Sequence, residues 1–157
     1  MPRKFTYAIL LSGLITLFLP YFFYFYGLQQ IQEFPEPCFK SLDTVSSQNI
    51  WQIYYGQGNP NLVKISPYNY VFAFLCNTQA STEEQIKKCN SKYPGLAHAN
   101  IFAGFYLRNS KKIQKPLTLG ISEAALAIWL TNHWSIDEIL NGIYYYREYF
   151  YKKHNKR

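Results

Sequence analysis

Glu123 is the side chain whose type and position in this sequence best fit a chemical role. It stands directly before an apolar run, AALAIWL, at residues 124–130. We expect Ser122 to be the N-cap of a helix that reaches about His133, with Glu123 in its first turn. Burial and the helix terminus act oppositely on such a carboxylate, an environment in which a general acid or base is often found. The alternative is a first-turn carboxylate that only complements the helix dipole.

The histidines give no support for a metal site. His98, His133 and His154 are widely separated and lack the H-x-x-x-H or Cys/His spacing that is typical of zinc ligands. The sequence also has no Gly-rich loop between a strand and a helix that would hold a phosphate. We therefore expect no metal and no cofactor.

The three cysteines indicate a disulfide rather than a catalytic thiol. Cys76 and Cys89 are 13 residues apart, and Cys38 is the third cysteine. In an oxidising compartment two of the three would be joined, and the sequence leaves every pairing among them open. No neighbouring residue supports a Cys/His nucleophile.

The N-terminal residues predict a membrane anchor. Residues 5–28 form an uncharged run that follows Arg3 and Lys4. As a helix these 24 residues would measure about 36 Å, enough to cross the hydrocarbon core of a bilayer with some tilt. The run exceeds the apolar part of a signal peptide, and no A-x-A-like cleavage site follows it. The positive-inside rule leaves Arg3 and Lys4 in the cytoplasm and the remainder outside. A buried core helix is the alternative.

Length and charge limit the classes of partner. The chain has 157 residues, which fits one modest domain, and 16 Lys and Arg against 9 Asp and Glu give a net charge of +7. Such a charge suits anionic lipid headgroups or nucleic acid, and a membrane anchor argues against nucleic acid. Five of the basic residues lie between residues 147 and 157, where the alternative role is a solvated, positively charged helix end.

Turn and capping signals divide the chain into an anchor (1–28), a connecting segment (29–64) and a helical domain (65–157). The connecting segment carries one expected strand at residues 50–55, IWQIYY, followed by a Gly-Gln-Gly-Asn-Pro turn. In the domain, N-cap and capping-box residues predict short helices separated by a basic loop at 111–116. The expected helices are Pro67 to about Leu75, one opening at Ser81-Thr82, Leu96 to Arg108, Glu123 to His133, and one after Ser135 with an apolar stripe at 136, 139, 140 and 143.

Two blocks of this sequence resemble the peptidoglycan glycosyltransferases of glycosyltransferase family 51. ISEAALAIWL at residues 121–130, followed by WSIDEIL at 134–140 and Tyr149-Phe150, resembles the family pattern R-K-x-x-E-A-x-x-A, then S-K-D-E-I-L-x-x-Y-x-N. ISPYNYVFAFL at residues 65–75 resembles the family helix I-P-P-x-L-x-x-A-x-I-A-A. The resemblance implies a small lysozyme-like α-helical domain behind one transmembrane helix. It also implies polymerisation of lipid II at the outer face of the bacterial cytoplasmic membrane.

The sequence departs from the family at catalytic positions. The first catalytic Glu of the family would fall near Asn77, whose amide cannot act as a general base. The Arg-Lys pair before the second Glu is Leu119-Gly120 here, and the Lys of the last motif is Ile136. The resemblance keeps only Glu123, which would assist departure of the lipid pyrophosphate.

Lys111, Lys112 and Lys115 are candidates to replace the missing cations. They lie in the loop before Glu123, where they would bind the pyrophosphate or, as the alternative, only solvate the loop. Losing one positioned general base costs about 10²–10⁴-fold in rate, so the sequence leaves open whether the protein is an enzyme.

Three functions therefore stand at this point. The first is a glycosyltransferase-like protein of the bacterial inner membrane that acts on, or binds, lipid II or a glycan strand. The second is an inactive scaffold or regulator that binds envelope protein partners. The third is a lysozyme-like enzyme that cleaves glycans with Glu123 as the acid.

Overall fold

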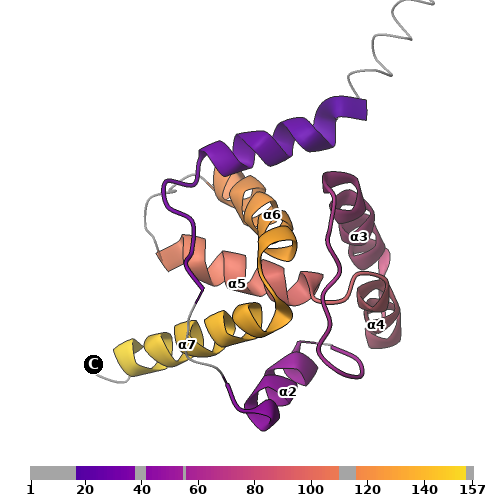
Figure 1. Cartoon of the computed structure of the whole chain (residues 1–157). Coiled ribbons are helices and arrows are strands. Elements are labelled where there is room, and N and C mark those ends of the chain that lie inside the picture. Colours follow the sequence, from indigo (N-terminus) through magenta and orange to yellow (C-terminus); the bar gives the residue numbers. More distant parts are fainter. Residues whose placement is uncertain (1–16, 38–41, 55, 110–115, 155–157) are drawn as a thin grey trace, which may run out of the picture.

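The computed structural model describes residues 17–37, 42–54, 56–109 and 116–154. Within these ranges the chain is helical and contains no strand, which confirms the prediction of a mainly α fold. A helix over residues 17–29 precedes α2 (Thr44–Ile53), α3 (Pro67–Gln79), α4 (Glu83–Lys92), α5 (Leu96–Asn109), α6 (Pro116–His133) and α7 (Ile136–His154). Figure 1 shows the other helices arranged around α5 and α6, with the helix over residues 17–29 at one end and α2 at the other.

Helix α6 is buried on nearly all sides because its sequence is apolar in every direction. Residues 125–128 are all buried, and four consecutive buried residues span a complete turn with no exposed face. Helix α5 packs against it, and its Ala99 and Ala103 are fully buried in the same core. Small alanine side chains let the two helix backbones approach closely.

Helix α7 packs against α5. Its predicted apolar stripe is confirmed, since Ile139, Leu140 and Ile143 are fully buried. Gly142 lies between them, where a Cβ atom would stand 2.5 Å from the Phe102 ring. Only glycine permits this contact without displacing the ring.

Three of the predicted helix starts are confirmed with their caps. The hydroxyls of Ser66, Thr82 and Ser135 each accept a hydrogen bond from a backbone N–H three residues later. At Ser135 the capping box is reciprocal, because its own N–H donates to the Glu138 carboxylate at 2.6 Å. These signals are local, so the sequence alone reveals them.

The prediction of a strand at residues 50–55 is wrong. Helix α2 includes residues 50–53 of this segment and is capped by Asp43, whose carboxylate accepts from the Ser46 N–H at 3.1 Å. Ile50 and Trp51 are buried in the core, and Trp51 stacks on His98 at 4.4 Å. A strand needs a partner strand for its backbone groups, and the described residues offer none.

The prediction that Ser122 caps a helix is also wrong. Helix α6 begins at Pro116, a residue well suited to the first helical turn because it lacks the N–H that would be unpaired there. Ser122 is fully buried within the helix. Glu123 consequently lies about two turns into α6 and not in its first turn.

A disulfide joins α3 to α4. Cys76 lies in the last part of α3, beyond the predicted end at Leu75, and bonds to Cys89 with a Cα–Cα distance of 5.8 Å. The pairing that the sequence left open is thus Cys76 with Cys89, and Cys38 lies outside the described residues.

The helix over residues 17–29 crosses α6 closely. A Cβ atom on Gly27 would stand 2.7 Å from both the Ala125 Cβ and the Ile121 carbonyl oxygen, and Tyr21 packs edge-on against Tyr68 of α3 at 5.6 Å. In the part of the chain that the structure describes, no helix has the length and apolar character needed to cross a membrane. The predicted span 5–28 includes residues 5–16, which lie outside that part, so the anchor stays a prediction.

Truncation of a core side chain of α6 should test the packing described above. Leu126 is fully buried between α6 and its neighbours, so Leu126→Ala is expected to lower the free energy of unfolding by about 2–5 kcal/mol. Leu117→Ala is the matched control in the same helix, because Leu117 is 78% exposed. Its effect should stay within about 0.5 kcal/mol. Urea unfolding of the detergent-solubilised protein measures both, and equal losses would contradict this account of the core.

Candidate functional site

Three adjoining cavities follow the helices α3, α4 and α5. The first, here called the apolar cavity, has a volume of about 510 Å³ and lies between the helix over residues 17–29, α3 and the start of α6. Its walls are carbon-rich side chains from all three helices. They include Phe23, Tyr24, Val71, Phe74, Leu117, Ile121 and Ala124.

The second, the middle cavity, has a volume of about 350 Å³ and lies between α3, α4 and α5. It shares Tyr70 and Phe74 with the apolar cavity, so the two are neighbours separated by these two rings. Ala73 forms part of its wall on α3, and the disulfide residue Cys89 forms part of its wall on α4.

The third, the polar cavity, has a volume of about 310 Å³ and lies where α2, the loop after it and the start of α5 meet. It shares four residues with the middle cavity, which are Tyr54, Asn90, Tyr93 and Ala97. The rest of its lining includes three side-chain amides and a hydroxyl, those of Gln57, Asn59, Asn61 and Ser91. The three cavities therefore form a series that changes from apolar to polar along the molecule.

The described side chains that line the three cavities include no Asp, Glu, Lys or Arg. His98, at the back of the polar cavity, is buried, and its Nε2 lies 3.1 Å from the Trp51 carbonyl. A carbonyl only accepts, so Nε2 carries the proton. Burial lowers the pKa of His98, against the opposing effect of that carbonyl. The series of cavities thus suits a ligand whose parts are apolar or neutral and hydrogen-bonding.

Tyr70 stands at the junction of the apolar and middle cavities. Its hydroxyl donates to the Asn100 side-chain oxygen at 3.0 Å. Burial, and secondarily the negative charge of Glu123, raise the pKa of Tyr70 to about 12. Tyr70 therefore remains a neutral hydrogen-bonding group throughout the physiological range.

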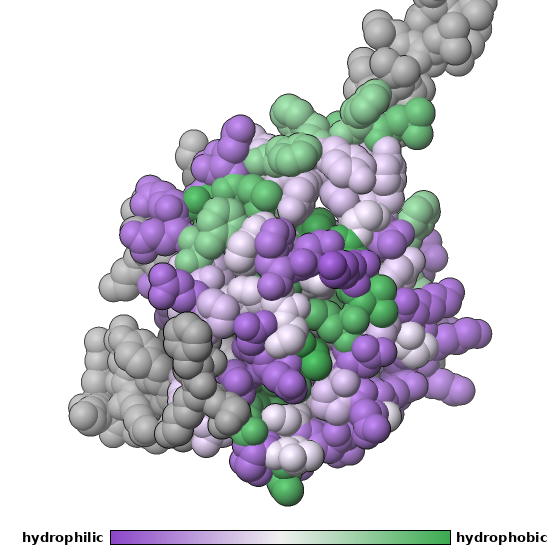
Figure 2. All heavy atoms as spheres, in the orientation of Figure 1, coloured by the Kyte–Doolittle hydropathy of each residue, from purple (hydrophilic) through white to green (hydrophobic). Residues whose placement is uncertain are grey.

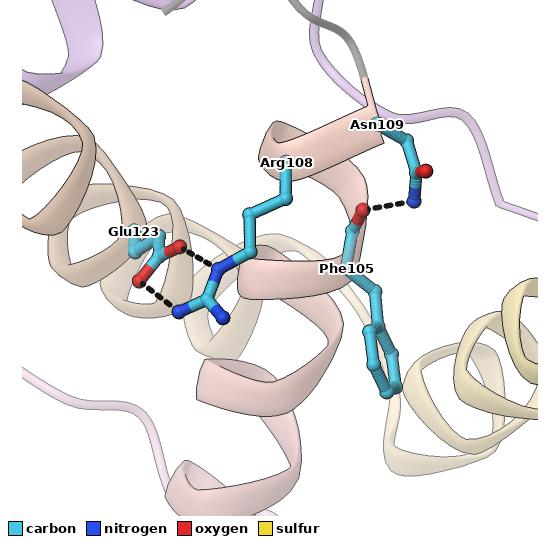
Figure 3. Close-up of polar contacts among 4 residues, drawn as sticks. All are labelled: Phe105, Arg108, Asn109 and Glu123. Atoms are coloured by element: carbon cyan, nitrogen blue, oxygen red, sulfur yellow. Dashed lines mark hydrogen bonds and ion pairs between the residues drawn. The ribbon is translucent and has the colours of Figure 1, made fainter. Parts of the chain in front are cut away.

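Glu123 is held by an ion pair on the neighbouring face of α6. Arg108 of α5 donates to its two carboxylate oxygens at 2.8 and 3.4 Å (Figure 3). The carboxylate packs over Gly104, where a Cβ would stand 3.7 Å from it. The Arg108 side chain is 68% exposed and that of Glu123 20%, so the pair contributes at most about 1 kcal/mol to stability. The alternative role of Glu123, a first-turn complement to the helix dipole, is wrong because Glu123 is not in the first turn.

Of the predicted site residues, the structure describes Asn77 and Glu123, and these two do not share a cavity. Asn77 lines the middle cavity and its amide donates to the Ala73 carbonyl of its own helix at 3.0 Å. Glu123 lines none of the three cavities. Lys111, Lys112 and Lys115 lie outside the described residues. Among the residues that the structure covers, no group of His, Cys, Asp or Glu could hold a metal ion.

Sequence reasoning missed the residues that link the cavities. Tyr54 follows α2, Tyr70 lies in α3, and Asn90 and Tyr93 lie at the end of α4, so no spacing in the chain reveals that these three segments meet. The partial signal was the amide-rich segment at residues 57–61, whose Gly and Pro residues indicate only a turn.

No family model, curated protein or solved structure matches this chain. The candidate site therefore rests on its own geometry.

The raised pKa of Tyr70 predicts how stability changes at high pH. In the unfolded chain a tyrosine loses its proton near pH 10, whereas folded Tyr70 keeps it until about pH 12. Between these values the unfolded state binds fewer protons, so the free energy of unfolding falls as pH rises. This contribution is fully present below pH 10 and falls by at most about 1.4 kcal/mol per pH unit above it. Urea unfolding at several alkaline pH values should show that the free energy of unfolding falls less steeply for Tyr70→Phe than for the wild type. Identical pH dependences for the two proteins would contradict this prediction.

Proposed function

We propose that this protein is a membrane-anchored binding protein for a lipid-linked glycan precursor of the lipid II type. It would act at the outer face of the bacterial cytoplasmic membrane and would not itself transfer glycosyl groups. The observation that carries the proposal is the series of three adjoining cavities, apolar at the end nearest the N-terminal helix and polar at the other. A ligand with a hydrocarbon chain and a sugar headgroup has the same gradient.

The apolar cavity suits the hydrocarbon chain. Its volume of about 510 Å³ and its lining by Phe23, Val71, Phe74 and Leu117 fit a flexible apolar chain, because such surfaces gain free energy when water is excluded. Lys115 directly precedes Pro116, which also lines this cavity. The lysines at 111, 112 and 115 would then provide positive charge for a pyrophosphate beside the chain.

The polar cavity suits the neutral sugars. The rings of Tyr54 and Tyr93 are half-buried in its wall, and the amides of Asn59, Asn61 and Asn90 surround it. A side-chain amide both donates and accepts hydrogen bonds, as a sugar hydroxyl does, and an aromatic face offers apolar contact to the carbon-bound hydrogens of a sugar ring. Ionised groups are not needed for this recognition.

Two further observations support the outer face of the membrane. A disulfide such as Cys76–Cys89 persists in an oxidising compartment. The uncharged run 5–28 after Arg3 and Lys4 would anchor the chain with its domain on that side.

The surroundings of Glu123 and Asn77 favour binding over transfer. The Glu123 carboxylate is engaged by Arg108 at 2.8 Å and does not line the cavities, while Asn77, which does line one, is an amide. A transferase would need a general base beside the acceptor hydroxyl. The second candidate function is therefore an inactive binding or regulatory protein with envelope partners. A glycan-cleaving enzyme is not favoured.

Filling the cavities should weaken binding of the ligand. Ala97 lies between the middle and polar cavities, and Ala124 lies in the wall of the apolar cavity. Ala97→Phe and Ala124→Phe are each expected to weaken binding of lipid II by about tenfold or more, equivalent to about 1.4 kcal/mol. Titration of the full-length protein in detergent with fluorescent lipid II measures the effect.

The matched control adds the same side chain elsewhere. Gln52→Phe places a ring on the exposed side of α2, away from the cavities, and should bind lipid II like the wild type. Binding of the carrier lipid without sugars should be impaired by Ala124→Phe and spared by Ala97→Phe. Undetectable binding to the wild type, or equal loss in all three variants, would overturn the proposal.

A polymerisation assay separates binding from catalysis. The wild type is expected to form no glycan chains from lipid II, and Glu123→Gln is expected to bind lipid II as the wild type does, because this carboxylate contacts Arg108 and not the cavities. Gel analysis of the products reports polymer length. Glycan chains from the wild type that disappear in Glu123→Gln would instead support a transferase in which Glu123 is catalytic.

A further inference from the structure

The outer face of α3 is apolar over most of its length. Val71, Phe72, Phe74 and Leu75 are all exposed, with 59% of Phe72 and 59% of Phe74 accessible to solvent. Residues three and four apart share one side of a helix, so these four side chains form an exposed apolar patch on the middle of α3, while the exposed residues nearer its ends, Asn69, Thr78 and Gln79, are polar and uncharged. The helix contains no Asp, Glu, Lys or Arg, although soluble proteins normally place charge on such a face.

This face continues onto two neighbouring helices. Leu117, at the start of α6, is 78% exposed and meets α3 in the wall of the apolar cavity. On the helix over residues 17–29, the exposed side chains include Leu17, Phe18, Phe22 and Phe23. We call the exposed apolar residues of α3 and the start of α6 (Val71, Phe72, Phe74, Leu75 and Leu117) the docking face. Figure 2 shows green atoms gathered at the end of the molecule where the described chain begins.

We infer that the docking face sits in the outer leaflet of the phospholipid bilayer, so that the domain is held by its own surface as well as by the N-terminal segment. This inference rests on the membrane attachment in the proposed function. It adds a second contact with the membrane that the anchor alone would not require.

The course of the chain identifies the bilayer as the occupant. Residues 5–28 carry no charge, and the described part of this run begins at Leu17, whose carbonyl accepts a hydrogen bond from the Tyr68 hydroxyl in the first turn of α3. If the run enters the bilayer, α3 lies beside the point of entry. The exposed apolar face of α3, rich in Phe and Leu, would then lie at the boundary between lipid headgroups and acyl chains. Interfacial helices bury their apolar side in this region.

The same placement gives the apolar cavity an entrance from the membrane. Val71, Phe74 and Leu117 belong both to the docking face and to the cavity wall. A hydrocarbon chain could then pass from the leaflet into the cavity without crossing water, which would be costly for an apolar surface. The polar cavity lies toward α2, at the other end of the fold (Figure 1).

Tryptophan fluorescence in nanodiscs made of brominated phospholipid tests the inference, because bromine quenches only nearby indoles. Phe72→Trp and Leu117→Trp put the probe on the docking face of the full-length protein. Val45→Trp is the control, since Val45 is 68% exposed but lies on α2 at the far end. The wild type, with its native tryptophans, provides the background.

We expect the added fluorescence of Phe72→Trp and Leu117→Trp to be lost in brominated discs and retained in unbrominated ones, while that of Val45→Trp is unchanged. Three outcomes would overturn the inference: equal quenching at all three positions, no quenching at residues 72 and 117, or failure of the full chain to enter the discs. In each case the docking face would instead be assigned to a protein partner. Lipid II binding is measured in detergent without a bilayer. If the protein fails to bind lipid II but quenching at residues 72 and 117 is observed, only the proposed function is overturned.

Discussion

The close packing of α6 against its neighbours is the constraint on which the rest of the fold depends. A helix that is apolar on every side must be covered on every side. Helix α5 covers one side with fully buried residues such as Ala103, and α3 contacts a second side. The crossing at Gly27, where a Cβ would stand 2.7 Å from α6, brings the helix over residues 17–29 onto a third.

The same constraint determines where the polar groups go. Glu123 is one of the few side chains of α6 that cannot be buried without a charged or hydrogen-bonding partner, since an unpaired carboxylate in a core is costly. It is accommodated because Gly104 leaves room above α5 and Arg108 reaches over to pair with it. Packing against Gly104 and pairing with Arg108 thus account for the position of Glu123, the residue that the sequence singled out as a candidate for chemistry. The cavities instead form along α3 and α4.

Helices α3 and α4 hold the cavities through few but specific contacts. The Cys76–Cys89 disulfide joins them, and the Tyr70–Asn100 hydrogen bond ties α3 to α5. These contacts leave Val71, Phe72, Phe74 and Leu75 of α3 exposed. The apolar cavity, the uncharged helix α3 and the uncharged helix over residues 17–29 consequently lie at one end of the molecule. The amide-rich loop after α2 lies toward the other end.

Local features of the sequence determined the helical class, the starts of α3, α4 and α7, and the buried stripe at residues 139–143, because a cap or a helical repeat is complete within a few residues. They did not determine α2, whose Ile50 and Trp51 have strand composition but pack as a helix on His98. Nor did they determine the true start of α6 or the partner of Glu123. Only the tertiary structure decided those, and it alone assembled Tyr54, Tyr70, Asn90 and Tyr93 around adjoining cavities, because side chains from separate segments become neighbours only when the helices pack.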